Sequence, residues 1–549
     1  MSGNNNKTTI VIGVDVGSGS VRVSLIKFVD GVIDSRPLAT HKKSITVHNT
    51  NTHIYEQNTD EIWSALCECV QNCMKTANIN YKQITGISFS ATCSLAIIDK
   101  NKTGNDVIMW MDHRAINEAK YITETKNAVL EQMGGNCSPE FSLAKLLWTK
   151  RHQRQRFDEA VGFMELPDWL AWKCSNFEAT EYPRSVCSVV CKWGYDAVNR
   201  RWRDDLLQLI GLEEFVKDKS KIGAKIVLPG THIGYVSKKV AKDFGFISNL
   251  NEINDECIDI SIASPLIDAH AGALSMCMFS HELKEVSNEQ LDYDNLFCMI
   301  AGTSTCDFIS THKRYFTEGV WGPYYDAIFP NYYVREAGQS TTGILLEHVI
   351  KNHQDYHQKL TDKPINDIIK DLNKQILGKP YKTKLNVNPC FHGSRLLANP
   401  YMKGGYYGLT MDGNNIVDWY HAAVEALAYE SKYILDELKI PDLKKVLISG
   451  GLAKNDVYMQ LHADVLNIDV ITFDLGDADL MLVGAAILAY HSIFKQDLNT
   501  KLVSYPDLDA TYFRPTPELQ DYHKLKYKCF REMLESATRI EEIMKDIHI

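Results

Sequence analysis

Alternating apolar and polar positions predict strands joined by a tight turn near the start of the chain. Residues 9–29 read "IVIGVDV", a Gly-Ser-Gly-Ser turn and "VRVSLIKF", the period-two pattern of a β-hairpin. Residues 84–99 predict another strand, a loop and a strand. Between these segments, residues 60–77 carry apolar side chains at helical spacing, which predicts a helix with Asp60 as its N-cap.

The second half of the chain repeats this pattern. Residues 296–310 again read as a strand, a Gly-Thr-Ser-Thr turn and a strand. Residues 338–351 predict the start of a helix, and residues 418–438 predict a long amphipathic helix. Residues 445–456 read as a strand, a glycine turn and the start of a helix. A strand–turn–strand unit followed by α/β elements therefore occurs twice.

The repeated pattern predicts an α/β protein with two similar domains. The chain has 549 residues, which is long enough for two domains and a large core. Residues 280–295 are polar and acidic, as expected of a connection between domains. We therefore expect an N-terminal domain of residues 1–280 and a C-terminal domain of residues 281–549 with a helical tail at 516–548.

Composition narrows the classes of protein to consider. Hydrophobic residues make up 45% and charged residues 23% of the chain, the values of an ordinary soluble protein. The net charge of -10 argues against a nucleic-acid partner, which needs a basic face. The start of the chain lacks the apolar core of a secretory signal, and the apolar segment 480–490 is too short to span a bilayer, so neither secretion nor a membrane partner is expected.

The chain has 14 cysteines, two groups of which lie close together in the sequence. Cys67, Cys69 and Cys73 form one group, and Cys187 and Cys191 the other. Neither group has the paired C-x₂-C spacing of a zinc finger. We interpret them as buried or free thiols in a reducing compartment, which favours a cytoplasmic protein.

Asp15 lies inside the first apolar strand, where an unpaired charge is costly. The glycine turn that follows lets backbone N–H groups approach a phosphate closely. A carboxylate beside it can hold the Mg²⁺ that accompanies the phosphate. A tight hairpin with a solvated aspartate is the alternative, and this stretch alone leaves both readings open.

Two further glycine turns favour the phosphate reading. Gly302-Thr303-Ser304-Thr305 has the same setting and adds hydroxyl donors. Ser449-Gly450-Gly451 follows a strand and precedes a helix, whose N-terminus can bind an anion. The spacing fits neither a P-loop nor the G-x-G-x-x-G turn of a dinucleotide fold. Three such turns in two similar halves therefore indicate a nucleotide site of another kind.

Asp268 is the candidate general base. It follows an apolar stretch and precedes the small residues of "AHAGA". A carboxylate at a strand end, before a close-packed helix, is placed to accept a proton from an alcohol. A helix N-cap is the alternative for this stretch taken alone. Nearby His270 has no partner at ligand spacing, so we interpret it as structural rather than as a metal ligand.

Together these motifs resemble the FGGY carbohydrate kinase family, in order across residues 9–495. The segments that carry the resemblance are the turn with Asp15, "DAHAG" at 268–272, "AGTST" at 301–305, "FHGSRLLANPYMKGGYYGL" at 391–409 and "ISGGLAKNDVYMQLHADVL" at 448–466. The resemblance implies two actin-like, ribonuclease H-like ATPase domains, with ATP and sugar in the cleft between them. Glu140 stands where glycerol kinases carry a tyrosine that touches substrate, which argues against glycerol.

Within the family, "TCSLA" at 92–96 and "MWMDHRA" at 109–115 resemble ribulokinases, and the first resembles the D-ribulokinase group. Each buried sugar hydroxyl needs a hydrogen-bond partner. The groups that can supply one are Thr92, Cys93, Ser94, Asp112, His113 and Arg114. Alternatively, Asp112 and Arg114 pair with one another and Thr92 only caps a strand.

Lys192, in "VCKWGYD", falls where ribulokinases carry a lysine near the sugar. A lysine there can neutralise the phosphate as it is transferred. An exposed lysine without a role in the reaction is the alternative. The residue pattern leaves the two readings open.

The resemblance implies ATP-dependent phosphorylation of a ketopentose, most simply D-ribulose to D-ribulose 5-phosphate, with Asp268 as base and Lys192 beside the phosphate. It implies that Asp15 holds Mg²⁺. The nucleotide contacts that it implies are Gly17, Gly19, Gly302, Thr303 and Ser304 for the phosphates, and Gly343, Gly450, Gly451 and Asn455 around the adenine nucleotide. The expected partners are ATP and the sugar, and association into a homo-oligomer stays open.

Three other functions remain to be weighed against this one. L-ribulose, xylulose or another polyol is the first alternative substrate. An actin-like ATP switch would hydrolyse ATP without transferring phosphate, but "DAHAG" and "WMDHRA" have no evident purpose in a switch. A silent sugar sensor would lack catalytic groups, whereas Asp15, Asp268 and the phosphate turns are all present.

Overall fold

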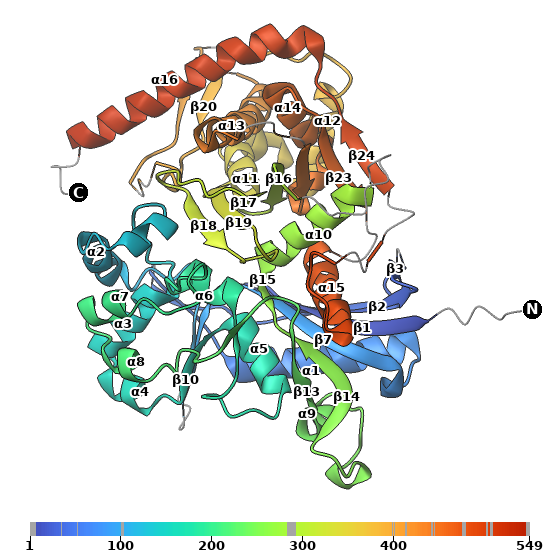
Figure 1. Cartoon of the computed structure of the whole chain (residues 1–549). Helices are drawn as coiled ribbons and strands as arrows, with labels where there is room; N and C mark the ends of the chain where they lie inside the picture. The colour runs from blue at the N-terminus through green and yellow to red at the C-terminus, as the bar shows by residue number, and fades with distance from the viewer. Residues whose placement is uncertain are drawn as a thin grey trace, which may run out of the picture.

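The computed structural model describes residues 7–544, apart from positions 35, 52, 100–103, 283–292, 398, 400, 412–413, 441–442, 444, 475–478, 501–502 and 505–508. Two α/β domains lie one above the other in Figure 1, with α10 (Asp268–Glu282) and α15 (Leu480–Phe494) between their sheets. The expected class and the two-domain architecture are confirmed. The expected boundary at 280 adjoins the segment 283–292, which lies outside the described residues, so its position stays a prediction.

The main sheet of the first domain is built around the hairpin that the sequence predicts. Strand β1 (Thr8–Val16) pairs antiparallel with β2 (Ser20–Val29) and parallel with β7 (Ile84–Ala91). The order is β13-β14-β7-β1-β2-β3, with β15 beside β7 and β4 beside β2. The other strands are β3 (Val32–Ile33), β4 (Ala39–Ser44), β13 (His232–Ser237), β14 (Cys257–Ala263) and β15 (Leu266–Ile267).

The sheet of the second domain repeats this arrangement. Strand β16 (Leu296–Ala301) pairs antiparallel with β17 (Thr305–Thr311) and parallel with β22 (Lys445–Ser449), as β1 does with β2 and β7. The order is β18-β19-β17-β16-β22-β23-β24. The other strands are β18 (Trp321–Tyr325), β19 (Tyr333–Gln339), β23 (Val470–Asp474) and β24 (Asp509–Phe513). The predicted repeat of the strand–turn–strand unit is therefore confirmed.

Smaller strands and the remaining helices surround these two sheets. A further sheet has the order β10-β8-β9-β6-β5, from β10 (Gly162–Glu165), β8 (Leu95–Ile98), β9 (Val107–Ile108), β6 (Ile54–Gln57) and β5 (His48–Asn51). Two short pairs join β11 (Arg184–Ser185) to β12 (Ile226–Val227) and β20 (Asn386–Asn388) to β21 (Gly405–Tyr407). The helices are α2 (Ile116–Glu124), α3 (Ser142–His152), α4 (Arg154–Glu159), α5 (Leu166–Cys174), α6 (Val186–Lys192), α7 (Asp204–Leu209), α8 (Glu214–Lys217), α9 (Lys238–Asp243), α11 (Gly343–Lys351), α12 (Ile365–Ile376), α13 (Ile416–Leu438), α14 (Asp456–Leu466) and α16 (Gln520–Met544).

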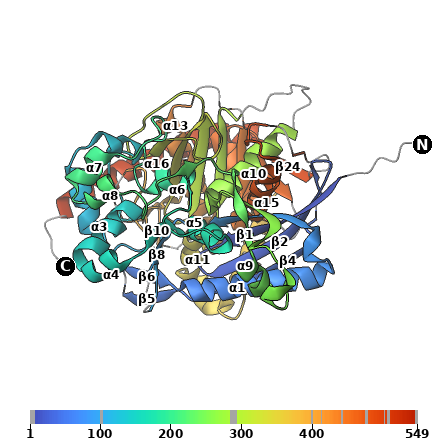
Figure 2. The ribbon, with the colours of Figure 1, turned by 60° about the horizontal axis from the view of Figure 1, so that its bottom comes forward.

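Helix α1 (Thr59–Ala77) packs against β2 and β4 on the outer face of the first sheet (Figure 2). The side chain of Asn58 accepts the backbone N–H groups of Asp60 and Glu61, so it satisfies two donors that the first turn leaves unpaired. The helix ends at Asn78 in the left-handed conformation, with a φ of 51°. The N-cap is therefore Asn58, and the expectation of Asp60 is wrong.

The two central helices cross between the domains, and glycines allow their close approach. A Cβ atom at Gly484 of α15 would lie 2.2 Å from the carbonyl oxygen of Ala271 in α10. A Cβ atom at Gly13 of β1 would lie 2.4 Å from the carbonyl oxygen of Leu482. Helix α15, although late in the sequence, therefore packs directly on the first sheet. Among the described helices, none is long and apolar enough to cross a membrane.

The alternation along β1 decides where Asp15 lies. Ile12 and Val14 belong to the hydrophobic core that includes α1. Gly13 contacts α15, so it lies on the opposite face of the strand. Asp15 is two residues further along and shares the face of Gly13. Its carboxylate is therefore directed toward the space between the two domains rather than into the outer core.

Candidate active site

A cavity of about 740 Å³ receives side chains from both domains. Asp268, Lys192 and Thr92 line it from the first domain, and Gly302 and Gly450 from the second. The turns after β16 and β22 meet here because the two strands are parallel and adjacent, so their carboxyl ends lie at the same sheet edge. The structure therefore brings together the candidate base, the candidate lysine and both candidate phosphate turns of the second domain.

Asp15 is completely buried and has two partners within the protein. The Nη2 atom of Arg22 lies 2.5 Å from its Oδ2, and the hydroxyl of Ser90 donates to its Oδ1 at 2.8 Å. Arg22 also pairs with Asp479, the residue before α15. Burial, opposed by Arg22, raises the pKa of Asp15 to about 7. Asp15 is thus not solvated, and its charge is compensated by an arginine that itself lines the cavity.

Asp268 is the first residue of α10 and lines the cavity. Its Oδ1 accepts the backbone N–H of Ala269 at 2.7 Å. Burial raises the pKa of its carboxyl group above the usual value, against this hydrogen bond and the charges of Arg22 and Lys192. A carboxylate with a raised pKa is a better proton acceptor, which is the property that a general base needs.

Lys192 ends α6 and is buried, so the alternative of an exposed lysine is wrong. Its ammonium lies 4.4 Å from the ring centre of Trp321 and 5.3 Å from that of Phe141. Burial opposes its positive charge, but the neighbouring Cys93 and, after it, Glu336, Cys191 and Glu140 outweigh burial and raise its pKa. The lysine therefore carries a positive charge at the wall of the cavity.

The expected sugar loop has only part of its residues at the cavity. Thr92 and Cys93 are lining residues, and burial raises the pKa of the Cys93 thiol to about 12, so the thiol is not activated. Ser94 is fully buried and its hydroxyl accepts the backbone N–H of Trp110 at 3.1 Å. It also lies 3.0 Å from the hydroxyl of Thr92. Ser94 therefore positions Thr92 and Trp110, and Trp110 lines the cavity.

Asp112 and Arg114 pair with one another, which was the alternative interpretation of these two residues in the sequence. The carboxylate of Asp112 accepts Arg114 Nε at 2.9 Å and Nη2 at 2.7 Å, and Glu56 accepts Nη2 at 2.8 Å. Asp112 also accepts the backbone N–H of Tyr55 at 2.7 Å. Neither member of the pair is among the cavity's lining residues, and His113 beside them is not either. This pair holds the loop that presents Trp110.

Of the remaining predicted nucleotide residues, Gly302, Ser304, Gly450 and Gly451 line the cavity. Gly17 and Gly19 are not lining residues, although Ser18 between them is, and Thr303 is exposed and is not a lining residue either. Gly343 lies behind the turn, where a Cβ atom would come within 2.7 Å of the carbonyl oxygen of Gly302.

Asn455 is buried and occupied within the protein. Its Oδ1 caps α14 through the N–H groups of Val457 and Tyr458, and its Nδ2 donates to the hydroxyl of Tyr420 at 2.7 Å. It is not a lining residue of the cavity. Asn455 therefore has a structural role, because it holds the start of α14, which follows the glycine turn.

Several lining residues are not among the predicted site residues. Those with charged or aromatic side chains are Arg22, Trp110, Glu140, Trp321, Glu336, Arg395, Lys454, Phe473, Asp474 and Asp479. Arg395 and Glu140 approach to 3.9 Å, so an ion pair joins the two domains across the cavity. For Arg22 the hairpin register is a usable signal, because it stands directly opposite Asp15. The others come from separate segments that only the tertiary fold brings together.

Comparison with known proteins agrees with this geometry. Residues 10–251 match the N-terminal domain, and residues 298–493 the C-terminal domain, of the FGGY family of carbohydrate kinases. An FGGY carbohydrate kinase domain-containing protein of Homo sapiens is 34% identical, with 100% of both chains covered. A D-ribulokinase of Saccharomyces cerevisiae is 29% identical over 87% of this chain and 71% of its own.

Solved structures show the same fold at low sequence identity. The xylulose kinase of Rhodospirillum rubrum superposes with a TM-score of 0.75 at 17% identity, covering 97% of this chain and 99% of its own. The Plasmodium falciparum glycerol kinase, solved with ADP, also gives 0.75, at 16% identity with 96% and 98% covered. The resemblance inferred from the sequence motifs is therefore confirmed.

Proposed function

The chain belongs to the FGGY family of carbohydrate kinases, and on that premise we propose that it transfers the γ-phosphoryl group of ATP to the terminal hydroxyl of D-ribulose, giving D-ribulose 5-phosphate. One observation carries the proposal: Asp268 and Lys192 line the same cavity as the glycine turns at Gly302 and Gly450. A proton acceptor and a cation thus face two backbone turns suited to phosphates.

The walls around Lys192 suit a small polyol. Glu140, Glu336 and Arg395 offer charged hydrogen-bond partners for hydroxyl groups, and Trp321 presents an apolar face for C–H groups. A site of this kind rejects analogues that leave one of its buried polar groups unpaired. The similarity to a yeast D-ribulokinase and the loop "TCSLA" favour D-ribulose among the ketopentoses.

In the proposed reaction Asp268 accepts the proton of the attacking hydroxyl. Its raised pKa and its place at the cavity wall support this role, which contributes roughly 10²–10⁴ in rate. Lys192 and Arg22 hold positive charge at the same wall and stabilise the negative charge on the phosphoryl oxygens. Most of the remaining acceleration comes from positioning, as in other phosphoryl transfers.

The acidic groups at the cavity also fit Mg²⁺, which prefers oxygen ligands. Asp268 and Asp479 line the cavity, and Asp15 joins them through Arg22. We propose that Asp15 and Asp479 hold the ion. Without the ion, Arg22 pairs with both carboxylates and balances their charge. When bound, Mg²⁺ would neutralise the phosphates of ATP and orient them.

We also propose a cytoplasmic location. All 14 cysteines are free thiols, which supports a reducing compartment. Light scattering of the full chain would determine its oligomeric state.

A substrate panel tests the proposed function. Initial rates of ADP formation are measured with D-ribulose, L-ribulose, D-xylulose and pentitols at saturating ATP. We expect D-ribulose to give the highest kcat/KM. A higher value for another sugar would replace the substrate, and ATP hydrolysis unaffected by any sugar would contradict a kinase.

Two buried lysines provide a matched pair of variants for the same assay. Lys192→Met removes the cation at the cavity wall and is expected to lower kcat strongly with little change in thermal stability. Lys145 is also buried, but its ammonium donates to the carbonyl oxygens of Met109, Trp110 and Glu140. Lys145→Met is therefore expected to lower stability first, because it leaves buried acceptors unpaired.

A further inference from the structure

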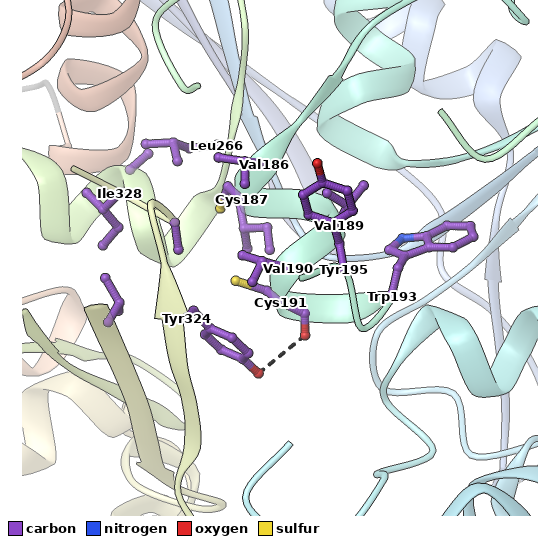
Figure 3. Close-up of a cluster of buried hydrophobic side chains, with 14 of the residues drawn as sticks. Val186, Cys187, Val189, Val190, Cys191, Trp193, Tyr195, Leu266, Tyr324 and Ile328 are labelled. Carbon is purple, nitrogen blue, oxygen red and sulfur yellow. Dashed lines mark hydrogen bonds between the residues drawn. The ribbon is translucent and has the colours of Figure 1, made fainter. Parts of the chain in front are cut away.

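Two cysteines and a histidine meet behind the wall of the cavity. Cys187 and Cys191 lie one helical turn apart on α6, and His270 lies in the first turn of α10. Their ligand atoms all lie within 4.8 Å of one another, and all three side chains are buried. Figure 3 shows both sulfur atoms on the same side of α6, directed away from Trp193.

The spacing follows from the helix, and one distance can be compared with a metal site. Residues four apart lie on one face of a helix, so both thiols are directed to the same neighbour. The Sγ atom of Cys191 lies 3.4 Å from Nε2 of His270. In a tetrahedral zinc site with Zn–S of about 2.3 Å and Zn–N of about 2.0 Å, a sulfur and a nitrogen ligand lie about 3.5 Å apart. The two atoms are thus already at ligand separation.

From this arrangement we propose that Cys187, Cys191 and His270 form a binding site for a thiophilic divalent metal ion of the Zn²⁺ type. Two thiolates and a neutral imidazole balance the charge of a dication, so the loaded site has no net charge. This matters because an uncompensated charge in a buried position would be costly. Soft sulfur with imidazole selects zinc over magnesium or calcium, which prefer oxygen.

The position of the imidazole suits this role. His270 is buried, with only 1% of its surface exposed. Its Nδ1 has no hydrogen-bond partner among the described residues, and its ring packs edge-on against Phe308 at 4.8 Å between centres. The ring is therefore held by packing, with Nε2 toward the cysteines.

The position of the cluster links it to the proposed active site without placing it in the cavity. His270 is two residues after Asp268, and Cys191 directly precedes Lys192. The hydroxyl of Tyr324, from the second domain, donates to the carbonyl oxygen of Cys191 at 3.3 Å (Figure 3). A metal ion would fasten α6 to α10 and so fix the lysine relative to the aspartate.

Cobalt provides the test, because thiolate–Co²⁺ coordination gives a charge-transfer absorption that thiols alone do not. The reduced full-length chain is loaded with Co²⁺ in two ways, by incubation of the folded protein and by expression in cobalt-supplemented medium. We expect one Co²⁺ per chain by elemental analysis, with the charge-transfer band, and loss of the band when Zn²⁺ displaces the cobalt. Absence of the band in both preparations overturns the proposal and leaves a thiol–imidazole hydrogen bond.

Variants locate the ligands. Cys187→Ser and Cys191→Ser are each expected to weaken Co²⁺ binding by at least tenfold, whereas Cys298→Ser serves as the control. Cys298 is equally buried and lies 3.5 Å from the sulfur of Cys277, in a pair without histidine. A band that survives in both α6 variants overturns the assignment, as does its loss in the control. Should a variant not fold, the wild-type measurement still decides, and none of these readouts depends on kinase activity.

Discussion

Replacing Asp268 by asparagine tests the proposed base with little change in shape. The asparagine carbonyl can still accept the N–H of Ala269, the hydrogen bond that Oδ1 makes at 2.7 Å, so the start of α10 is preserved. Burial raises the pKa of Asp268, which means that its charged form is disfavoured in the fold. Removing the charge is therefore expected to leave the free energy of unfolding unchanged or slightly higher.

The expected loss in turnover follows from the role of a general base. Such a group contributes roughly 10²–10⁴ in rate, which corresponds to about 3–5 kcal/mol in activation free energy. Asp268→Asn should lower kcat by this factor, with KM for D-ribulose and the affinity for ATP nearly unchanged. The thermal melting temperature of the variant provides the control for folding.

The pH dependence provides a second, independent reading. A base must be deprotonated to act, so wild-type activity falls as the pH decreases through the raised pKa of Asp268. This acidic limb should lie above the value of 3.8 for an ordinary aspartate. The asparagine variant should lose the contribution of Asp268 and keep only that of Asp15, whose pKa burial raises to about 7. Initial rates of ADP formation from low to neutral pH measure both. A variant with kcat within a few-fold of wild type, or one whose pH profile is identical to that of wild type, would refute the role of Asp268.

Three further predictions concern the stability of the fold in and around the site. Gly450 has a φ of 96°, and a Cβ atom added there would lie 2.4 Å from a backbone oxygen, so Gly450→Ala should lower the free energy of unfolding in urea by about 2–5 kcal/mol. Gly451→Ala should lower it little, because a Cβ atom there would have nothing within 4 Å. Equal losses in the two variants would contradict this reasoning. Asp112→Asn breaks the buried pair with Arg114 and should cost about 3 kcal/mol in urea unfolding. Because the pair lies outside the cavity lining and acts on it only through the loop with Trp110, a rise in KM for D-ribulose should accompany the loss of stability. A raised KM at full stability would restore a sugar contact. Burial raises the pKa of Asp307 to about 7, and neither of its oxygens has a hydrogen-bond partner among the described residues. A carboxyl with a raised pKa in the fold makes stability fall as the pH rises from about 4 to about 7, so Asp307→Asn should melt higher than wild type at pH 8 and not at pH 4; a gain independent of pH would argue against this cause.

Local sequence determined the elements of the fold and the turns at the centre of the site. The patterns in residues 9–29 and 296–310 produced the two hairpins as expected. The first strand of each hairpin is buried along nearly its whole length, so it is covered on both faces rather than on one. Gly302, in the turn between β16 and β17, and Gly450, directly after β22, both line the cavity, as the glycine turns in the sequence indicated. Asp268 likewise lies at the strand–helix junction that its neighbours indicated.

The tertiary structure decided which of the candidate side chains face the cavity. The sequence alone does not place Arg22 beside Asp479, because 457 residues separate them and only the packing of α15 on the first sheet joins them. It left open whether Lys192 is buried and whether Asp112 pairs with Arg114. From the sequence, Cys187 and Cys191 are interpreted as buried or free thiols and His270 as structural, since no spacing links a helix of the first domain to one that begins 76 residues later. The periodicity of a sequence reflects which face of a helix or strand is buried. A site depends instead on contacts between different helices and strands, and these are fixed only when the elements pack together.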